Sequence, residues 1–226
     1  MIAVATGVAA TALSVSPVRL RLTGAASRAI TITNAGSEAA TVEAQRASYV
    51  LDRRGKPIVA RRGHRAAAWL RLRPPRLLLA PGGTATVTVS AIAPAGAHPG
   101  DHPALVLLVT QPQRDAAIAV RMRIGVVVYV RVAGRIVHRL ELKSLRVRRR
   151  VLEAAVENRG NVVERTRVRV SLSRGGRIIA RLGPIGRTLL PHSRAIERFR
   201  YRGRVRGWVT AQVRAGALRR TFRLRL

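Results

Sequence analysis

Few residues of this chain are spaced for catalysis. The sequence has no cysteine and only ten Asp and Glu residues among 226. General acid–base catalysis needs two carboxylates close together, and these carboxylates are scattered. The chain has no Gly-x-Ser-x-Gly segment, and its pattern brings no Ser, His and Asp together as a nucleophile, its base and an orienting acid. The sequence therefore predicts a protein that is not an enzyme.

One loop contains residue types that bind divalent metals. His98, Asp101 and His102 fall within the segment His-Pro-Gly-Asp-His, and two imidazoles with a carboxylate are suitable ligands. The other histidines are scattered along the chain, so this loop has no evident fourth ligand. We expect these side chains to be solvated, and we predict neither a metal site nor another cofactor.

Arginine provides the strongest chemical signal in the chain. The formal net charge is +33, and all of the 43 basic residues except Lys56 and Lys143 are arginine. Two groups of arginines are spaced two residues apart, so the members of each group share one face of a predicted strand. Together they predict a basic face that binds phosphate or carboxylate polymers. The predicted anion-binding residues are Arg165, Arg167, Arg169, Arg198, Arg200 and Arg202.

Alternatives to this interpretation remain open. A very GC-rich genome also replaces surface lysine with arginine, and the strands would then have ordinary solvated charged faces. Nucleic acid is another class of ligand, but its bases favour aromatic residues interleaved with the basic ones. Phe, Trp and Tyr make up only 3% of the chain, so among polymers we expect an anionic cell-wall polymer before nucleic acid.

The longest β-type run covers residues 116–134 and organises the predicted fold. Apolar and polar residues alternate up to Arg123, and Val, Ile and Tyr follow almost without interruption. Such a run predicts a long strand that is first half-buried and then fully buried. It is too short and too often interrupted by arginine for a membrane helix. We expect residues 116–132 to form the last strand of a first domain.

Short alternating runs separated by turn residues fill the rest of the chain. No helical periodicity lasts for more than one turn, and the 47% of hydrophobic residues suffice for a packed core. The pattern predicts an all-β protein of two tandem immunoglobulin-like antiparallel β-sandwich domains. The first domain spans residues 15–134 and the second spans 137–226. Residues 58–68 are expected to form a connection or an irregular edge, and residues 94–103 are expected to form a loop.

Two internal echoes support the tandem arrangement. The segment from Asn34 to Gly36 matches the segment from Asn158 to Gly160, each between two β-type runs. Leu-Ala-Pro ending at Pro81 likewise matches Leu-Pro at Pro191, each just before an alternating run.

The N-terminal residues resemble a leader for export. Residues 1–14 are apolar, uncharged and rich in small residues, with Ala10-Thr11-Ala12 as a candidate cleavage site. A buried first strand is the alternative. We expect an exported protein, located at the cell surface, in the cell wall or in the periplasm.

Four segments in this order resemble two related groups of bacterial proteins. They are SVSPVRLRL from Ser14, ITITNAGS from Ile30, LAPGGTATVTV from Leu79 and RIGVVVYVRVAG from Arg123. One group is the periplasmic pilus-assembly chaperones, whose N-terminal domain the first half resembles. The other is the WxL-interacting surface proteins of Gram-positive bacteria, which have an immunoglobulin-like domain followed by a further sandwich. The resemblance covers nearly the whole chain.

The chaperone resemblance implies a role for individual residues. These chaperones hold a terminal carboxylate of their client with an Arg in the first strand and a Lys in the last strand of domain one. Arg19 matches the first position, whereas the second falls at Gly125, which has no charge. Arg123 could replace the lysine only if the register shifted by two residues. The resemblance thus implies half of a carboxylate clamp.

The sequence as a whole favours binding over catalysis. Our first interpretation is an exported cell-surface or wall-associated protein that pairs with a partner protein along an exposed strand edge and holds anionic wall polymer. The alternative is an export chaperone that acts by donor-strand pairing. The predicted partner-binding residues are Arg19, Arg123, Val126, Val128 and Val130.

Overall fold

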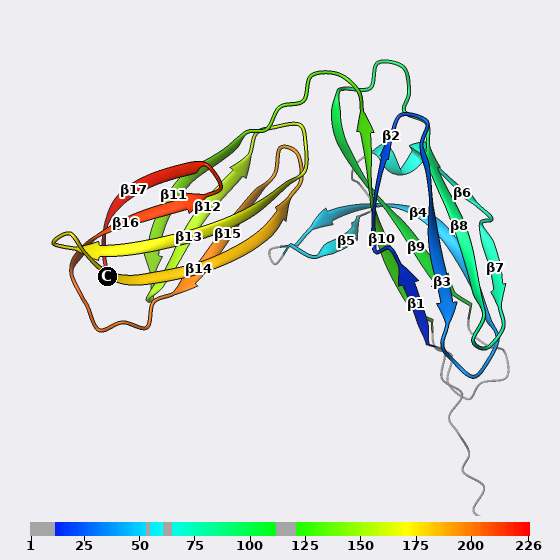
Figure 1. The fold of residues 1–226 in the computed structure, drawn as a ribbon, viewed down its shortest axis with the longest axis horizontal. Helices are drawn as coiled ribbons and strands as arrows, with labels where there is room; N and C mark the ends of the chain where they lie inside the picture. Colours follow the sequence, from blue (N-terminus) through cyan, green and yellow to red (C-terminus); the bar gives the residue numbers. More distant parts are fainter. Residues whose placement is uncertain (1–11, 53–54, 61–64, 112–120) are drawn as a thin grey trace, which may run out of the picture. The chain divides into compact units, whose positions relative to one another are not determined.

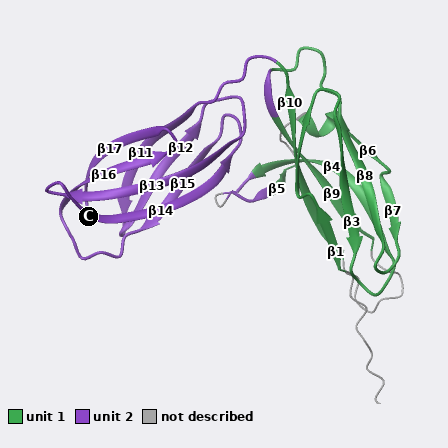
Figure 2. Ribbon diagram, viewed as in Figure 1, with its two compact units in different colours: residues 1–50, 58–98, 102–133 green, residues 51–57, 99–101, 134–226 purple. Residues whose placement is uncertain are grey.

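The computed structural model describes residues 12–52, 55–60, 65–111 and 121–226. These residues form two compact units, which divide principally between Ala133 and Gly134 (Figure 2). The second unit also includes residues 51–57 and 99–101. Residues 1–11 of the predicted leader and residues 116–120 of the predicted long strand lie outside the described residues. In the described part of the chain, no helix has the length and apolar character needed to cross a bilayer.

The first unit is a sandwich of two sheets (Figure 1). One sheet has the strand order β1-β3-β8-β6, and the other has the order β2-β10-β9-β4-β5, with β7 also paired to β4. The strands are β1 (Leu13–Ser16), β2 (Arg19–Thr23), β3 (Ser27–Asn34), β4 (Ala40–Leu51), β5 (Pro57–Ala60), β6 (Leu70–Arg73), β7 (Arg76–Leu79), β8 (Thr84–Ala91), β9 (Gly100–Thr110) and β10 (Arg123–Val132).

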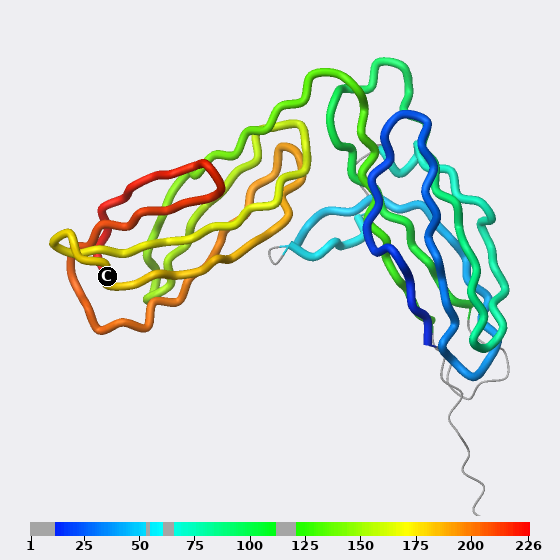
Figure 3. The backbone as a smooth tube through the Cα atoms, in the orientation of Figure 1, coloured from blue at the N-terminus to red at the C-terminus, as the bar shows by residue number. Residues whose placement is uncertain are grey.

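The first strand of this unit changes sheets partway along. β1 pairs with β3 in one sheet, and β2 pairs in parallel with β10 in the other. The chain trace shows β1 continuing into β2 through a bend (Figure 3). Pro17 lies at this bend and has no N–H to donate to a ladder, which suits a position between two strands. The parallel pair is an exception to the antiparallel arrangement expected from the sequence.

Alternation decides which side chains fill the space between these two sheets. Leu20 and Leu22 of β2 join Val126, Val128 and Val130 of β10 in one buried hydrophobic cluster. Each such side chain contributes roughly 1.5–3 kcal/mol when it leaves water. The residues between them point to the opposite face of the sheet, which for β2 gives a strict buried–exposed alternation.

The second unit is a smaller sandwich with its own core. Its sheets have the orders β11-β12-β15 and β14-β13-β16-β17. The strands are β11 (Leu140–Arg148), β12 (Val151–Asn158), β13 (Glu164–Arg174), β14 (Arg177–Leu189), β15 (Arg194–Arg200), β16 (Trp208–Ala215) and β17 (Leu218–Arg225). Each sheet contributes alternate side chains to the second hydrophobic cluster, among them Leu152, Val170 and Phe199.

A buried asparagine occupies the same place in each unit. The Asn34 amide nitrogen donates to the carbonyl oxygens of Glu38, Leu79 and Ala80, while its Oδ1 accepts from the Gly36 N–H. In the second unit Asn158 makes the corresponding set of contacts. Its partners are Val162, Leu189, Leu190 and Gly160. The two echoes in the sequence are therefore the two halves of one repeated contact, which ties a turn after one strand to the end of another.

Three segments differ from the sequence-based expectation. β5 and a 3-10 helix (Arg65–Trp69) overlap the two ends of the region 58–68, which was expected to be a connection or an irregular edge. β9 begins at Gly100, inside the expected 94–103 loop. Leu13 and Ser14, at the end of the predicted leader, belong to β1. Region 58–68 is basic and poorly patterned, 94–103 is rich in Gly and Pro, and residues 1–14 resemble a leader, whereas pairing of β5 with β4 and of β1 with β3 supplies partners for the backbone.

Candidate functional site

The candidate site is β10, the strand that organises the first unit. Even-numbered residues of β10 point into the core, and odd-numbered residues point to the opposite face, which we call the outer face. The Met122 carbonyl accepts from the Thr110 N–H at 3.0 Å, and the Met122 N–H donates to Thr110 Oγ1 at 2.8 Å. The backbone groups of even-numbered residues therefore point toward β9, since N–H and C=O directions also alternate along a strand.

Pairing with β2 covers only the second half of β10. The register joins Val127 to Arg19 and continues to Arg131, and the Val127 N–H donates to the Val18 carbonyl at 3.1 Å. Before Val127, no strand of the described residues pairs with β10 on this side. The N–H and C=O groups of Arg123 and Gly125 point to this side, because they have the parity of Val127. We call residues 123–126 the open edge.

The predicted partner-binding valines divide between the covered and the open part. Val126, Val128 and Val130 are buried with side chains in the core. Val128 and Val130 also lie in the section that β2 covers, so their edge is not available to another strand. Of the predicted set, only Arg123 and Val126 fall within residues 123–126. Val126 directs its side chain into the core and its backbone groups toward β9, so Arg123 alone can pair with another strand there.

Arg19 lies on the outer face, beside β10. It is exposed, and no carboxylate of the described residues forms an ion pair with it. Two buried tyrosines, Tyr49 and Tyr129, lie close to one another on this face. Burial raises the pKa of Tyr49 above its ordinary value, the Tyr129 hydroxyl raises it further, and the Arg19 charge lowers it. Within the described residues, the Tyr49 hydroxyl has no partner in hydrogen-bond geometry.

The second cation of a carboxylate clamp is missing from this arrangement. Gly125 lies on the outer face two residues before Val127, the residue paired with Arg19. A Cβ at Gly125 would lie 3.3 Å from Leu105 Cδ1, a contact with the end of a side chain. Arg123 is exposed on the same face, but it lies four residues before Val127, roughly 13 Å along the strand. The register shows no shift that would place Arg123 at the position of Gly125.

The two predicted arginine ladders do not form one face. Arg165, Arg167 and Arg169 belong to β13, whereas Arg198 and Arg200 belong to β15 in the opposite sheet and Arg202 follows its end. All six side chains are exposed. The two-residue spacing correctly predicts that the arginines of one strand share one side of it, but the sequence does not show to which sheet each strand belongs.

The His-Pro-Gly-Asp-His loop is only partly solvated. Asp101 is buried, and its Oδ2 accepts from the Val163 N–H at 2.9 Å. His102 Nε2 is 2.7 Å from the His98 carbonyl oxygen, and its ring lies 4.7 Å from that of Trp69. The expectation of a solvated Asp101 was therefore wrong, because this carboxylate satisfies a backbone N–H of another segment. Among the described residues, no three His, Asp or Glu side chains gather as metal ligands.

Comparison with known proteins gives matches in structure only. No protein-family model and no curated protein matches the chain. The crystal structure of the YadV chaperone has a TM-score of 0.56 at 11% identity, covering 95% of this chain and 99% of that one. The class 5 fimbriae chaperone CfaA has a TM-score of 0.56 at 9% identity, with 95% and 98% covered.

A third similar structure is a complex. It is the CsuC–CsuE chaperone–tip adhesion subunit pre-assembly complex from archaic chaperone-usher Csu pili of Acinetobacter baumannii, with a TM-score of 0.52 at 14% identity and 94% and 97% covered. At these identities the likeness establishes the fold. The chain is an all-β protein with two immunoglobulin-like β-sandwich domains, as the sequence predicts.

Proposed function

We propose that this protein is an exported assembly chaperone, which binds an unfinished subunit by strand pairing along the open edge of β10. The observation that carries the proposal is the edge itself. β9 holds residues 123–126 extended from one side, while the N–H and C=O groups of Arg123 and Gly125 face outward on the other side. An exposed edge of this kind is a template for an added strand.

The outward groups of the open edge define what a partner would have to supply. A strand that added along this edge would form main-chain hydrogen bonds with the N–H and C=O groups of Arg123 and Gly125. A subunit lacking one strand of its own sandwich is a partner that needs such pairing.

The fold likeness favours the chaperone alternative over our first interpretation, a surface scaffold. The similar structures named above are chaperones, and one is bound to a tip adhesion subunit. The proposal therefore assigns a protein partner, export from the cytoplasm and no catalytic role. Arg19 is the proposed contact for a carboxylate of that partner, by charge-assisted hydrogen bonds from its guanidinium. Binding to wall polymer through Arg198, Arg200 and Arg202 remains a separate prediction.

A pair of substitutions at Gly125 tests the proposal. Gly125→Pro removes the outward N–H, and proline is tolerated on a strand whose N–H faces away from its neighbour. Gly125→Ala keeps that N–H and adds only a Cβ. We expect the envelope protein that co-purifies with the natural chain to remain bound to the alanine variant and to be lost from the proline variant.

The fold of both variants needs to be checked alongside. Circular dichroism and thermal unfolding should match those of the natural chain, since β9 pairs through the even-numbered residues. Equal co-purification by the two variants would contradict pairing at the open edge, whatever the identity of the bound protein.

A further inference from the structure

One face of the second unit is covered with arginine. In the β14-β13-β16-β17 sheet, alternate residues such as Val168, Val170 and Val213 fill the core, and the residues between them point outward. We call the outward side the arginine face. Its exposed arginines from three neighbouring strands are Arg165, Arg167, Arg169, Arg214, Arg219, Arg223 and Arg225.

The arginine face places like charges directly opposite one another. Arg169 pairs with Arg214, and Arg214 pairs with Arg219, so three arginine residues form a row across three strands. Cβ atoms of such cross-strand pairs are about 4.5–5.5 Å apart, and like charges at this separation destabilise a sheet. No Asp or Glu lies among the outward-pointing residues of these four described strands. The stability of the sheet does not account for this arrangement.

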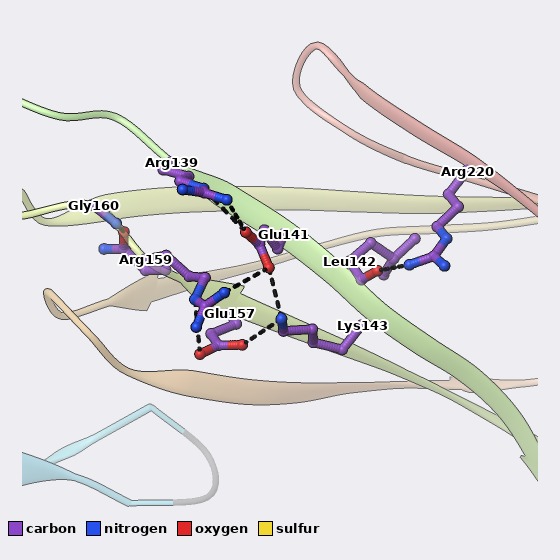
Figure 4. Close-up of polar contacts among 9 residues, drawn as sticks. Arg139, Glu141, Leu142, Lys143, Glu157, Arg159, Gly160 and Arg220 are labelled. Atoms are coloured by element: carbon purple, nitrogen blue, oxygen red, sulfur yellow. Dashed lines mark hydrogen bonds and ion pairs between the residues drawn. The ribbon is translucent and has the colours of Figure 1, made fainter.

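The opposite sheet of the same unit is organised differently. On its outer side Lys143 Nζ lies 2.6 Å from Glu141 Oε2 and 3.2 Å from Glu157 Oε2, as Figure 4 shows. Arg198 Nε lies 2.9 Å from Glu153 Oε1 on the same side. The outer side of that sheet thus includes three glutamates, Glu141, Glu153 and Glu157, which pair with some of its basic residues. A general surplus of arginine would affect both sheets, whereas only the arginine face combines its arginines with a complete lack of acidic residues among the described strands.

Two further features lie on the arginine face. Arg165, Arg167, Pro184 and Gly186 line a hollow of about 490 Å³, which exists because glycine and proline leave the space opposite the arginines unfilled. At the other end of the face, Trp208 is 56% exposed, and the Arg223 guanidinium lies 5.2 Å from its ring centre.

A second exposed apolar side chain lies toward the same end of this face. Ile178 is 53% exposed, and it reaches this face because it pairs with Ser173, which in turn pairs with Thr210, two residues after Trp208. Exposed tryptophan and isoleucine on one face, with arginine around them, is a composition that suits the interface between water and lipid.

We propose that the arginine face binds the surface of an anionic phospholipid bilayer. The arginines would contact phosphate headgroups, with one headgroup in the hollow, while Trp208 and Ile178 enter the interfacial layer. This inference concerns the second unit and does not depend on strand pairing by β10. A linear polyanion is the alternative class of ligand, but the arginines extend in two directions across the sheet, which matches a planar array of headgroups. A strand of bases would need more aromatic surface than Trp208 provides.

The test compares two variants with the same loss of charge. The first carries Arg167→Thr, Arg169→Thr and Arg214→Thr, which removes the centre of the arginine face and keeps residues that favour strands. The matched control carries Arg146→Thr, Arg148→Thr and Arg194→Thr, whose exposed side chains belong to the opposite sheet. Co-sedimentation uses vesicles of phosphatidylcholine alone or with a minority of phosphatidylglycerol. Circular dichroism checks that both variants fold.

We expect the natural chain and the control to sediment with the anionic vesicles and not with the neutral ones. The face variant should bind roughly a hundredfold more weakly, since each basic residue near an anionic bilayer contributes about a factor of five. With Trp69→Phe as the background, the emission of Trp208 should shift to the blue on vesicle binding.

Three results would overturn the proposal. The first is equal loss of binding in the face variant and the control, which would reduce the effect to net charge. The second is vesicle binding with no change in Trp208 emission. The third is preferential binding of soluble polyphosphate or of a thymidine oligonucleotide over anionic vesicles at the same salt concentration, which would assign the face to a linear polyanion.

Discussion

Replacing Asn158 should destabilise the second domain more than any single surface change. Its amide nitrogen lies 2.7 Å from Val162 O, 3.3 Å from Leu189 O and 3.1 Å from Leu190 O, and its Oδ1 lies 2.9 Å from Gly160 N. The side chain is fully buried, so water cannot replace these partners. Two amide protons serve three carbonyls, which makes about three effective bonds at ~1 kcal/mol each. With the carbonyls left unpaired, Asn158→Ala should cost about 3–5 kcal/mol.

An aspartate at the same position adds a pH-dependent version of this test. Asn158→Asp keeps the acceptor for Gly160 but directs a second oxygen at the carbonyls, which favours the protonated acid in the folded state. The folded-state pKa of this introduced carboxyl would thus lie above its unfolded value of about 3.9. Stability should therefore be highest at low pH and should fall as the pH rises from the unfolded pKa toward the folded one.

Urea denaturation can assign these losses to one domain. Trp208 belongs to the second unit and Trp69 to the first, so single-tryptophan backgrounds report the two transitions separately. Asn34→Ala is the matched control, since Asn34 makes the corresponding contacts in the first unit. A loss under 1 kcal/mol for Asn158→Ala, or an equal shift of both transitions, would refute the reasoning.

Three further predictions concern charged pairs and the open edge. Arg187→Met removes the Nε group that lies 2.9 Å from the buried Glu197 carboxylate, so denaturation should show a loss of about 3–5 kcal/mol, and an unchanged midpoint would contradict this. The hydrogen bond from Lys143 holds the pKa of Glu141 below its ordinary value, so Lys143→Met should raise that pKa in an NMR titration. The small stabilisation by Glu141 is present above its unfolded-state pKa, and it is lost as the pH falls through its folded-state pKa. Gly125→Lys adds a second cation to the outer face and should tighten binding of a peptide with a free C-terminal carboxylate several-fold over its amide, whereas equal affinities would exclude a clamp there.

Alternation along the strands made most of the fold predictable. Period-two runs such as Arg165–Leu172 show which side chains are buried, whatever their partner strand. The repeated Asn-x-Gly segment and the repeated Leu-Pro segment could each be recognised, because each is a short continuous stretch of sequence. That Asn34 and Asn158 bond to these Leu-Pro segments is a contact between distant residues, which only the structure shows.

Pairing between distant strands was not predictable from the sequence. The run 116–132 indicates one long strand, but the division of β10 into covered and open parts depends on β2, which lies about a hundred residues earlier in the chain. For the same reason the ladders of β13 and β15 appeared adjacent although they belong to different sheets. Arg214 and Arg219 were missed as partners of Arg169, since only the register reveals the row.

Site-specific cross-linking at the open edge tests the central claim most directly. The chain has no cysteine, so Arg123→Cys introduces a unique thiol, to which a short photoreactive group can be attached. Thr86→Cys, exposed in the other sheet of the first unit, is the control. The account predicts that Arg123→Cys captures one exported protein through a single β-type segment and that adding Gly125→Pro abolishes capture. The same set of products from both thiols, or capture that survives Gly125→Pro, would contradict it.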